Sequence, residues 1–205
     1  ENDSTTSNSL AWASSSYCLT TQLNSQGLEP RTSLTYRTDN ASIQLSATRM
    51  IQYNHALVKS GGLTDKITWV PSTPGILPQS SWQYAVGWSQ SRPGQTFKYS
   101  IGAYFKQMQN LSMYRYYYGD PYLYYRWEAN TLSGGKGRAY GLELTAEKSF
   151  RRWSGGVNYT LSHNQRQYDE LNESKWFNDL YDRRHILNLN AVYKMSKTLQ
   201  LSILW

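Results

Sequence analysis

Two glutamates spaced four residues apart are the side chains most suggestive of acid–base chemistry in this 205-residue chain. Glu143 and Glu147 lie in a segment in which every second residue is apolar, so both would project from the polar face of one strand. Four residues of strand span about 13 Å, whereas the two carboxyl groups of a glycosidase lie about 5 to 9.5 Å apart. The spacing therefore favours two solvated carboxylates over a catalytic pair.

The other motifs that could bind a metal or a phosphate lack the usual spacing. His55, His163 and His185 lie in separate segments without a close pair or an HExxH motif, and the single cysteine, Cys18, excludes thiolate clusters and internal disulfides. Residues 133–137 (SGGKG) have glycines and a lysine but not the spacing of a phosphate-binding loop, and are expected to form a flexible hairpin loop. We predict no enzymatic activity, no metal site and no cofactor.

Tyrosine side chains are concentrated in segment 109–137, and segment 53–79 contributes Trp69. Both segments are expected to be long loops, because glycine, proline or irregular patterning interrupts them. Tyrosine and tryptophan offer rigid amphipathic surfaces that stack on sugars, peptides or flat cofactors. The alternative is that they pack a loop canopy and an interfacial girdle. Both interpretations stay open for the candidate ligand-binding residues, which are Trp69, Tyr114, Tyr116, Tyr117, Tyr118, Tyr122, Tyr124, Tyr125 and Trp127.

The elements that would carry these side chains follow from alternation of apolar and polar residues with a period of two. Such alternation indicates strands with one apolar and one polar face. The clearest example is the segment from Arg138 to Trp205, which predicts two successive β-hairpins. Apolar alternation predicts nine strands, within residues 17–23, 34–36, 43–51, 82–88, 97–105, 140–146, 153–161, 187–193 and 199–205.

The length of these runs and the position of their aromatic residues indicate strands that cross a membrane. The clearest runs extend over about 9 to 11 residues, the length that a tilted strand needs to cross a bilayer, and aromatics such as Tyr140, Trp153 and Tyr193 lie near their ends. Mean hydropathy is −0.68 and no run of 18 apolar residues exists, which excludes helical membrane spans. Although the net charge is +7, lysine and arginine are scattered, so nucleic-acid binding is not expected.

The predicted connections alternate between short ones, at 38–40, 92–95, 150–152 and 195–197, and long ones, at 53–80, 109–137 and 165–183. Antiparallel strands would gather all long connections at one end, as in outer-membrane barrels. Nine is an odd number, whereas bacterial single-chain barrels have even numbers of strands. We therefore expect an all-β fold in which residues 1–205 are part of one antiparallel transmembrane β-barrel domain, with 22 strands in the whole barrel and with the plug domain and remaining strands absent.

Three segments resemble, in this order, the late barrel strands of Bacteroidetes-type TonB-dependent outer-membrane receptors: residues 137–143 (GRAYGLE), 156–162 (GVNYTLS) and 181–189 (YDRRHILNL). Glu29 to Arg31, and Gln52 and Tyr53 with His55, resemble the middle barrel of the same family. The resemblance covers most of residues 29–205. It implies uptake of a nutrient or scarce ligand at the bacterial outer membrane. The partners it implies are outer-membrane lipid, the TonB complex through the absent N-terminal part, a surface lipoprotein, and a small-molecule, peptide or glycan ligand.

The most recognisable motif, YDRRH, is expected at the rim of a strand. We interpret Tyr181, Asp182, Arg183, Arg184 and His185 as a structural cluster of ion pairs and hydrogen bonds rather than a ligand contact, and Glu29 and Arg31 as part of the same set of structural residues. A second hypothesis, from another functional class, is a non-transporting adhesin or carbohydrate-binding module. Such a module would be a soluble domain, whereas a barrel needs detergent or lipid.

Overall fold

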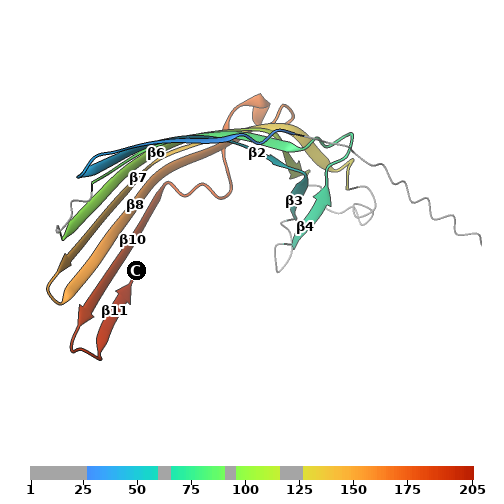
Figure 1. Ribbon diagram of the computed structural model, residues 1–205. Coiled ribbons are helices and arrows are strands. Elements are labelled where there is room, and N and C mark those ends of the chain that lie inside the picture. Colours follow the sequence, from blue (N-terminus) through green and yellow to red (C-terminus); the bar gives the residue numbers. More distant parts are fainter. Residues whose placement is uncertain (1–26, 60–65, 91–95, 116–126) are drawn as a thin grey trace, which may run out of the picture.

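The strands of this protein form one large, curved antiparallel sheet and one small hairpin (Figure 1). The computed structural model describes residues 27–59, 66–90, 96–115 and 127–205. Besides the strands, these residues include one 3-10 helix, η2 (Asn172–Ser174). The strands are β1 (Arg31–Arg37), β2 (Ala41–Gln52), β3 (Asn54–Lys59), β4 (Lys66–Pro71), β5 (Gln79–Gln90), β6 (Phe97–Tyr114), β7 (Thr131–Phe150), β8 (Trp153–Gln167), β9 (Phe177–Asn178), β10 (His185–Lys194) and β11 (Gln200–Leu204).

The large sheet has nine strands in the order β1-β2-β5-β6-β7-β8-β10-β11, with the short β9 paired to β8. Every pairing is antiparallel. The outermost strands of the path, β1 and β11, are not paired with each other, so the sheet is not closed. The prediction of an all-β fold with a large antiparallel sheet is thus confirmed, and eight of the nine predicted strands lie in this path; the predicted strand at residues 17–23 lies outside the described residues.

The hydrogen-bond register aligns the apolar side chains of neighbouring strands into continuous rows. Leu45 of β2 lies opposite Leu34 of β1 and Val86 of β5, and the row continues across β6, β7 and β8. The alternation predicted for each strand therefore has the same phase in all of them, which gives the sheet one apolar face. The eight residues with the clearest predicted orientation share this face: Leu142, Leu144, Val157, Tyr159, Leu187, Leu189, Leu201 and Ile203.

The opposite face of the sheet is polar and carries small residues. Ser42 and Ser89 are register partners whose hydroxyl oxygens lie 2.8 Å apart. At Gly141, an added Cβ would lie 2.7 Å from the backbone oxygen of Leu161 and 2.9 Å from the ring of Tyr104. The ring of Tyr104 therefore lies over Gly141, where a larger residue would not fit without a shift.

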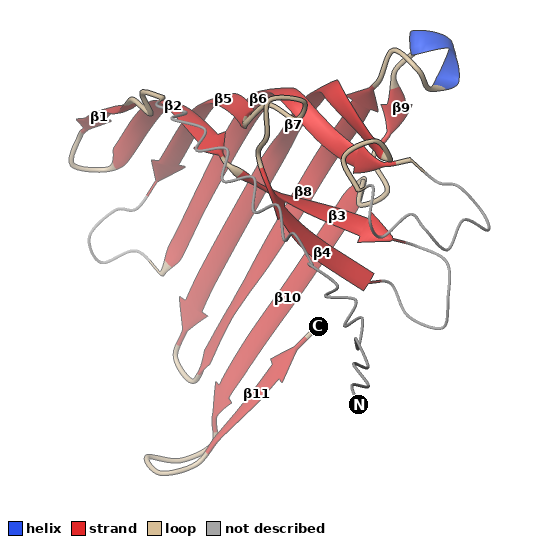
Figure 2. Ribbon diagram, turned by 90° about the vertical axis from the view of Figure 1, so that its right-hand side faces the viewer, coloured by secondary structure: helices blue, strands red, loops and turns tan. Residues whose placement is uncertain are grey.

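The hairpin β3–β4 identifies the polar face as the concave one. Figures 1 and 2 show this hairpin on the concave side of the sheet, where its strands cross the sheet instead of extending it. Gln79, which belongs to the polar set of β5, donates a hydrogen bond to His55 of the hairpin. The apolar face is consequently the convex one, and in β5 its side chains Trp82, Tyr84 and Val86 are exposed while those between them are half-buried.

The segments expected to be long loops contain more strand than the sequence predicted. Residues 53–79 were predicted to have no regular structure, yet they contain β3 and β4. The predicted loop 109–137 is shortened by β6, which continues to Tyr114, and by β7, which begins at Thr131. Residues 133–137, predicted to be a flexible hairpin loop, lie within β7. β8 likewise extends to Gln167, into the predicted loop 165–183.

The reason for these errors is a loss of period at irregular positions. The pairing of β6 and β7 shifts register between Met108 and Leu111 and again before Met113, and Asn110 has a positive φ of 56°. Gly134, on the facing strand, has φ of 75°, which glycine adopts without the steric cost of a side chain. Each such bulge moves the following residues to the other face, so a strand continues where alternation is no longer recognisable.

The turns at the opposite end match the predictions more closely. Thr38 to Asn40 connect β1 to β2, and Arg151 and Arg152 connect β7 to β8, as expected. The turn after β10 is longer than predicted, because β11 begins only at Gln200 and leaves Leu199 in the turn. We refer to this end as the short-turn end and to the other as the long-loop end. No helix in the described part of the chain is long and apolar enough to span a membrane.

Candidate functional site

The aromatic residues proposed as ligand contacts are only partly covered by the structure. Trp69 lies in β4 with 65% of its surface exposed, Tyr114 ends β6 and is half-buried, and Trp127 begins the turn before β7 and is also half-buried. These three residues all lie at the long-loop end or in the hairpin that folds from it. Tyr116, Tyr117, Tyr118, Tyr122, Tyr124 and Tyr125 lie outside the described residues.

The hairpin β3–β4 is amphipathic, and its inner face is anchored by a buried histidine. His55 has no exposed surface, and Leu57 and Val70 on the same face are also buried. On the opposite face of the hairpin, Ile67 and Trp69 are exposed. This hairpin was not predicted from the sequence, although the β-branched and aromatic run from Ile67 to Val70 was a signal that could have located β4.

The hydrogen bonds of His55 define its protonation state. Its Nδ1 accepts from Gln79 Nε2 at 3.1 Å, and Ser112 Oγ lies 3.1 Å from the same nitrogen. Its Nε2 lies 2.9 Å from Ser72 Oγ, which in turn donates to the carbonyl oxygen of Tyr53 at 2.9 Å. Since the hydroxyl proton of Ser72 is directed at Tyr53, Nε2 carries the proton and donates to Ser72. A neutral imidazole thus connects β3 with β5 and β6, and tethers the hairpin to the main sheet.

We expect the hairpin to loosen as the pH falls below the ordinary histidine pKa of 6.5, because burial lowers the pKa of His55 in the folded protein. Above this value the neutral form is present in both states and stability is unaffected. Below it, the unfolded segment binds a proton more readily than the folded one, and a proton on Nδ1 would displace the donors Gln79 and Ser112. No Asp, Glu, Lys or Arg side chain is among the hydrogen-bond partners described for this ring.

Hydrogen exchange of the β3 and β4 amides at pH 7.5 and 5.5, corrected for the intrinsic rate, measures this effect. Protection should fall at the lower pH, and the difference should disappear in His55→Gln. Equal corrected protection of the wild-type hairpin at both pH values would show that His55 does not control it.

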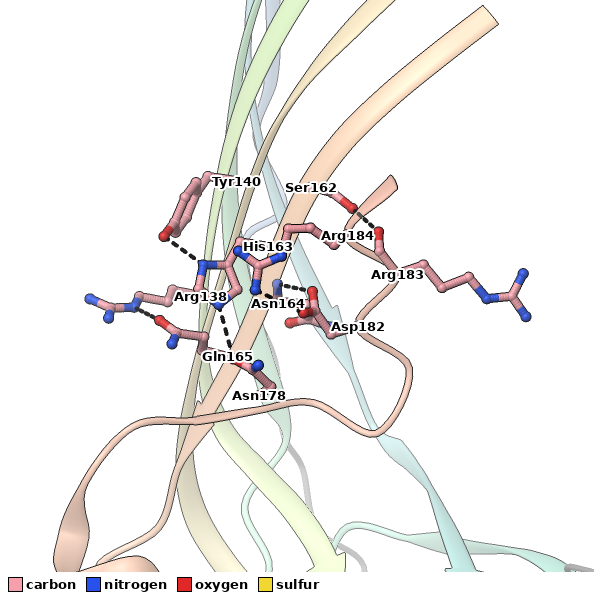
Figure 3. A network of polar contacts seen from close by, with 10 residues as sticks. All are labelled: Arg138, Tyr140, Ser162, His163, Asn164, Gln165, Asn178, Asp182, Arg183 and Arg184. Carbon is pink, nitrogen blue, oxygen red and sulfur yellow. Dashed lines mark hydrogen bonds and ion pairs between the residues drawn. The ribbon is translucent and has the colours of Figure 1, made fainter. Parts of the chain in front are cut away.

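The YDRRH segment covers the edge of β8 at the long-loop end, beyond the last residue that pairs with β10 (Figure 3). Asp182 Oδ1 accepts the backbone N–H of Asn164 at 2.8 Å, in place of a carbonyl from a neighbouring strand. Arg184 and Arg183 use their backbone oxygens, which accept from the N–H and the hydroxyl of Ser162 at 3.0 and 2.8 Å. β10 begins at the last residue of the motif, His185. The segment therefore satisfies β8 backbone groups that would otherwise be open for pairing.

The side chains of the motif do not form one cluster. Asp182 and Arg184 make an ion pair at 3.2 Å, but the bond described for Arg183 uses its backbone. His185 is hydrogen-bonded through Nδ1 to the hydroxyl of Tyr159 at 2.8 Å, on the convex face. Glu29 and Arg31 lie apart from the motif, at the start of β1, with a 3.5 Å ion pair and a hydrogen bond from the N–H of Ile51 to Glu29.

Side chains of β7 and β8 also bind the segment between β8 and β10. The hydroxyl of Tyr140 lies 2.9 Å from His163 Nδ1, and His163 Nε2 lies 2.9 Å from Asn178 Oδ1 (Figure 3). Arg138 donates to Gln165 at 2.8 Å and lies 4.3 Å above the ring of Trp176. These polar residues lie on the convex face next to its apolar rows, on the side of the long-loop end.

The two glutamates considered for acid–base chemistry lie on the concave face. Glu147 is the register partner of Lys98, and Glu143 lies opposite Gly102 and Thr160. Within the described ranges, no group of three or more His, Cys, Asp or Glu residues could hold a metal ion. The arrangement offers polar surface on the concave side, apolar surface on the convex side and a covered rim at the long-loop end.

Comparison with protein-family models and with curated proteins found no match for this chain.

Proposed function

We propose that the chain is the barrel portion of a TonB-dependent outer-membrane receptor, which takes up a nutrient or scarce ligand captured at the long-loop end. The observation that carries this proposal is the convex face: apolar rows in a common register, exposed on the outside of a curved sheet whose concave face is polar. In water such an exposed apolar surface would be far larger than monomeric proteins tolerate, whereas hydrocarbon would cover it.

The height of the apolar face supports a membrane. On β7 it extends from Tyr140 to Phe150, with one charged residue, Lys148, near its short-turn limit. This is about 33 Å along the strand and about 25 Å along the normal of a bilayer at the usual tilt. Above it, the same face continues with polar side chains, namely Arg49, Gln107, Arg138, Gln165 and Asn178, which succeed one another across the strands apart from Trp82 in β5. At its limit near the short-turn end lie Phe150, Trp153 and Tyr193, which are register partners.

The aromatic residues at both limits support the same interpretation. Trp82 and Tyr84 stack at the upper limit with ring centroids 6.0 Å apart, and Trp153 and Tyr193 pack at the lower limit with centroids 4.4 Å apart. Aromatic girdles of this kind mark the two interfaces of transmembrane barrels. The ordered resemblance of residues 137–189 adds the specific family and, with it, energy coupling through TonB and a surface lipoprotein as partner.

The hairpin β3–β4 supports a role in ligand capture. It is tethered at the long-loop end by His55 and presents Ile67 and Trp69 on its exposed face. On the concave side of a barrel wall this face would be directed toward the lumen. We propose that Trp69 contributes to the first contact with a small-molecule, peptide or glycan ligand, because an exposed indole can stack on an apolar or sugar surface.

Cysteine labelling at two adjacent positions tests the membrane assignment. In a Cys18→Ser background reconstituted in lipid vesicles, Thr145→Cys on the polar face should react with a water-soluble maleimide at least about tenfold faster than Leu144→Cys, because a thiol in hydrocarbon does not form the reactive thiolate. Both positions lie in the middle of β7, so local backbone stability is matched.

Equal labelling of the two cysteines, together with a monodisperse protein in buffer without detergent, would contradict the proposal. That outcome would favour the adhesin or carbohydrate-binding module.

A further inference from the structure

A groove on the convex face near the short-turn end has the features of a binding site for a single lipid. It has a volume of about 450 Å³ and crosses four strands. The convex-face residues that line it are Phe97, Ala146, Lys148, Phe150, Trp153, Gly155, Val157, Leu189 and Ala191.

The groove is deepest in side-chain terms where two small residues, Gly155 of β8 and Ala191 of β10, are register partners. Lys148, Gly155 and Ala191 are successive register partners on β7, β8 and β10. The row above contains Val157 and Leu189, which are bulkier. At Gly155 an added Cβ would lie 2.9 Å from the backbone oxygen of Asn190, so the strand spacing leaves no room for a side chain there. The resulting depression is apolar and elongated across the strands, which suits a hydrocarbon chain.

Positive charge is concentrated at the same place. Lys148 lines the groove, and Arg151 and Arg152 follow in the turn between β7 and β8. Arg152 donates to the backbone oxygen of Met195 in the neighbouring turn, and Arg151 lies 5.3 Å above the ring of Phe150. In the described strands of the large sheet, neither Asp nor Glu occupies a convex-face position. Glu147 also lines the groove, but by its register it belongs to the concave set, opposite Lys98. The groove therefore complements a negatively charged ligand.

We propose that this groove binds an anionic glycerophospholipid, with one acyl chain over Gly155 and Ala191 and the phosphate contacting Lys148 and Arg151. This inference rests on the proposed membrane location. Ammonium and guanidinium groups form strong, charge-assisted hydrogen bonds to phosphate oxygens. Trp153, which is largely exposed at the margin of the groove, would lie at headgroup depth, where tryptophan is favoured.

The test measures lipid retention on the purified 205-residue protein in a non-ionic detergent by native mass spectrometry. The probes are phosphatidylglycerol, phosphatidylcholine with identical acyl chains, and glycerol phosphate. Phosphatidylglycerol should bind more tightly than phosphatidylcholine, and glycerol phosphate should not compete. Lys148→Gln should weaken phosphatidylglycerol binding by about tenfold, as expected for the loss of one hydrogen bond to a charged group.

Lys98→Gln is the matched control, since it removes the same charge in the adjacent row of the neighbouring strand but on the concave face. It should leave binding within about twofold of the wild type. Ala191→Phe, which fills the groove without a change in charge, should weaken both phospholipids. If this variant fails to fold, the comparison of Lys148→Gln with Lys98→Gln alone decides.

Equal effects of Lys148→Gln and Lys98→Gln would overturn the proposal, as would full competition by glycerol phosphate, which indicates a site for free anions. A doubled mass without lipid would assign the groove to a second copy of the chain. Loss of phospholipid selectivity while Leu144→Cys remains protected from maleimide would overturn the lipid site and leave the membrane assignment intact.

Discussion

Leu189→Arg is expected to destabilise the protein in a lipid bilayer by about 2 to 4 kcal/mol, whereas Asn190→Arg should cost far less. Leu189 lies on the convex face in the row formed with Val157 and Ala146, close to the middle of the apolar height, and 37% of its surface is exposed. An arginine there would place its guanidinium in hydrocarbon. Asn190, the next residue of β10, lies on the concave polar face opposite Gly156, where an arginine side chain would remain in water.

Unfolding of the two variants by denaturant in lipid vesicles, compared with the wild type, gives the difference in free energy. Because the substitutions are adjacent in one strand, differences in strand propensity largely cancel. If both variants lose the same amount of stability, the two faces of the sheet do not face different solvents, and the membrane assignment fails.

Asp179→Ala is expected to cost about 2 to 3 kcal/mol, less than the 3 to 5 kcal/mol typical of breaking a fully buried ion pair. The Asp179 side chain is only 3% exposed and pairs with Arg166, which is 31% exposed and therefore partly solvated. Asp179 also accepts the backbone N–H of Tyr181 at 3.1 Å. Removal of the carboxylate would leave Arg166 of β8 without this partner and release the turn that leads into the YDRRH segment.

The control is Glu173→Ala, in the same loop. Glu173 pairs with Lys175, but their side chains are 80% and 70% exposed, so the substitution should change stability by no more than about 0.5 kcal/mol. Denaturant unfolding gives the magnitudes, and hydrogen exchange of residues 168–184 locates the change. Similar losses in the two variants would show that burial of the Asp179–Arg166 pair contributes nothing to the attachment of this loop.

The sequence by itself determined the faces of the strands and the end of the sheet at which each short turn lies. Alternation with a period of two is a local property, because successive side chains of a strand point to opposite sides whatever the strand pairs with. The apolar runs around Leu142, Val157 and Leu189 therefore specified a two-faced sheet, and turn residues such as Arg151 and Arg152 limited the hairpins. The candidate loop aromatics were chosen by residue type alone, and Trp69 could be placed in an exposed strand only from the structure.

Only the tertiary structure decided the curvature, the hairpin on the concave face and the covered edge of β8. His55 meets Ser112, which is 57 residues away in the sequence, and Asn164 meets Asp182 from the returning loop. Such contacts depend on which segments the sheet brings together, and no local pattern encodes that. The same limit explains the missed ends of β6 and β7: at Asn110 and Gly134 the backbone turns to positive φ, so the strands continue through hydrogen bonds to each other while the alternation that marks a strand is lost.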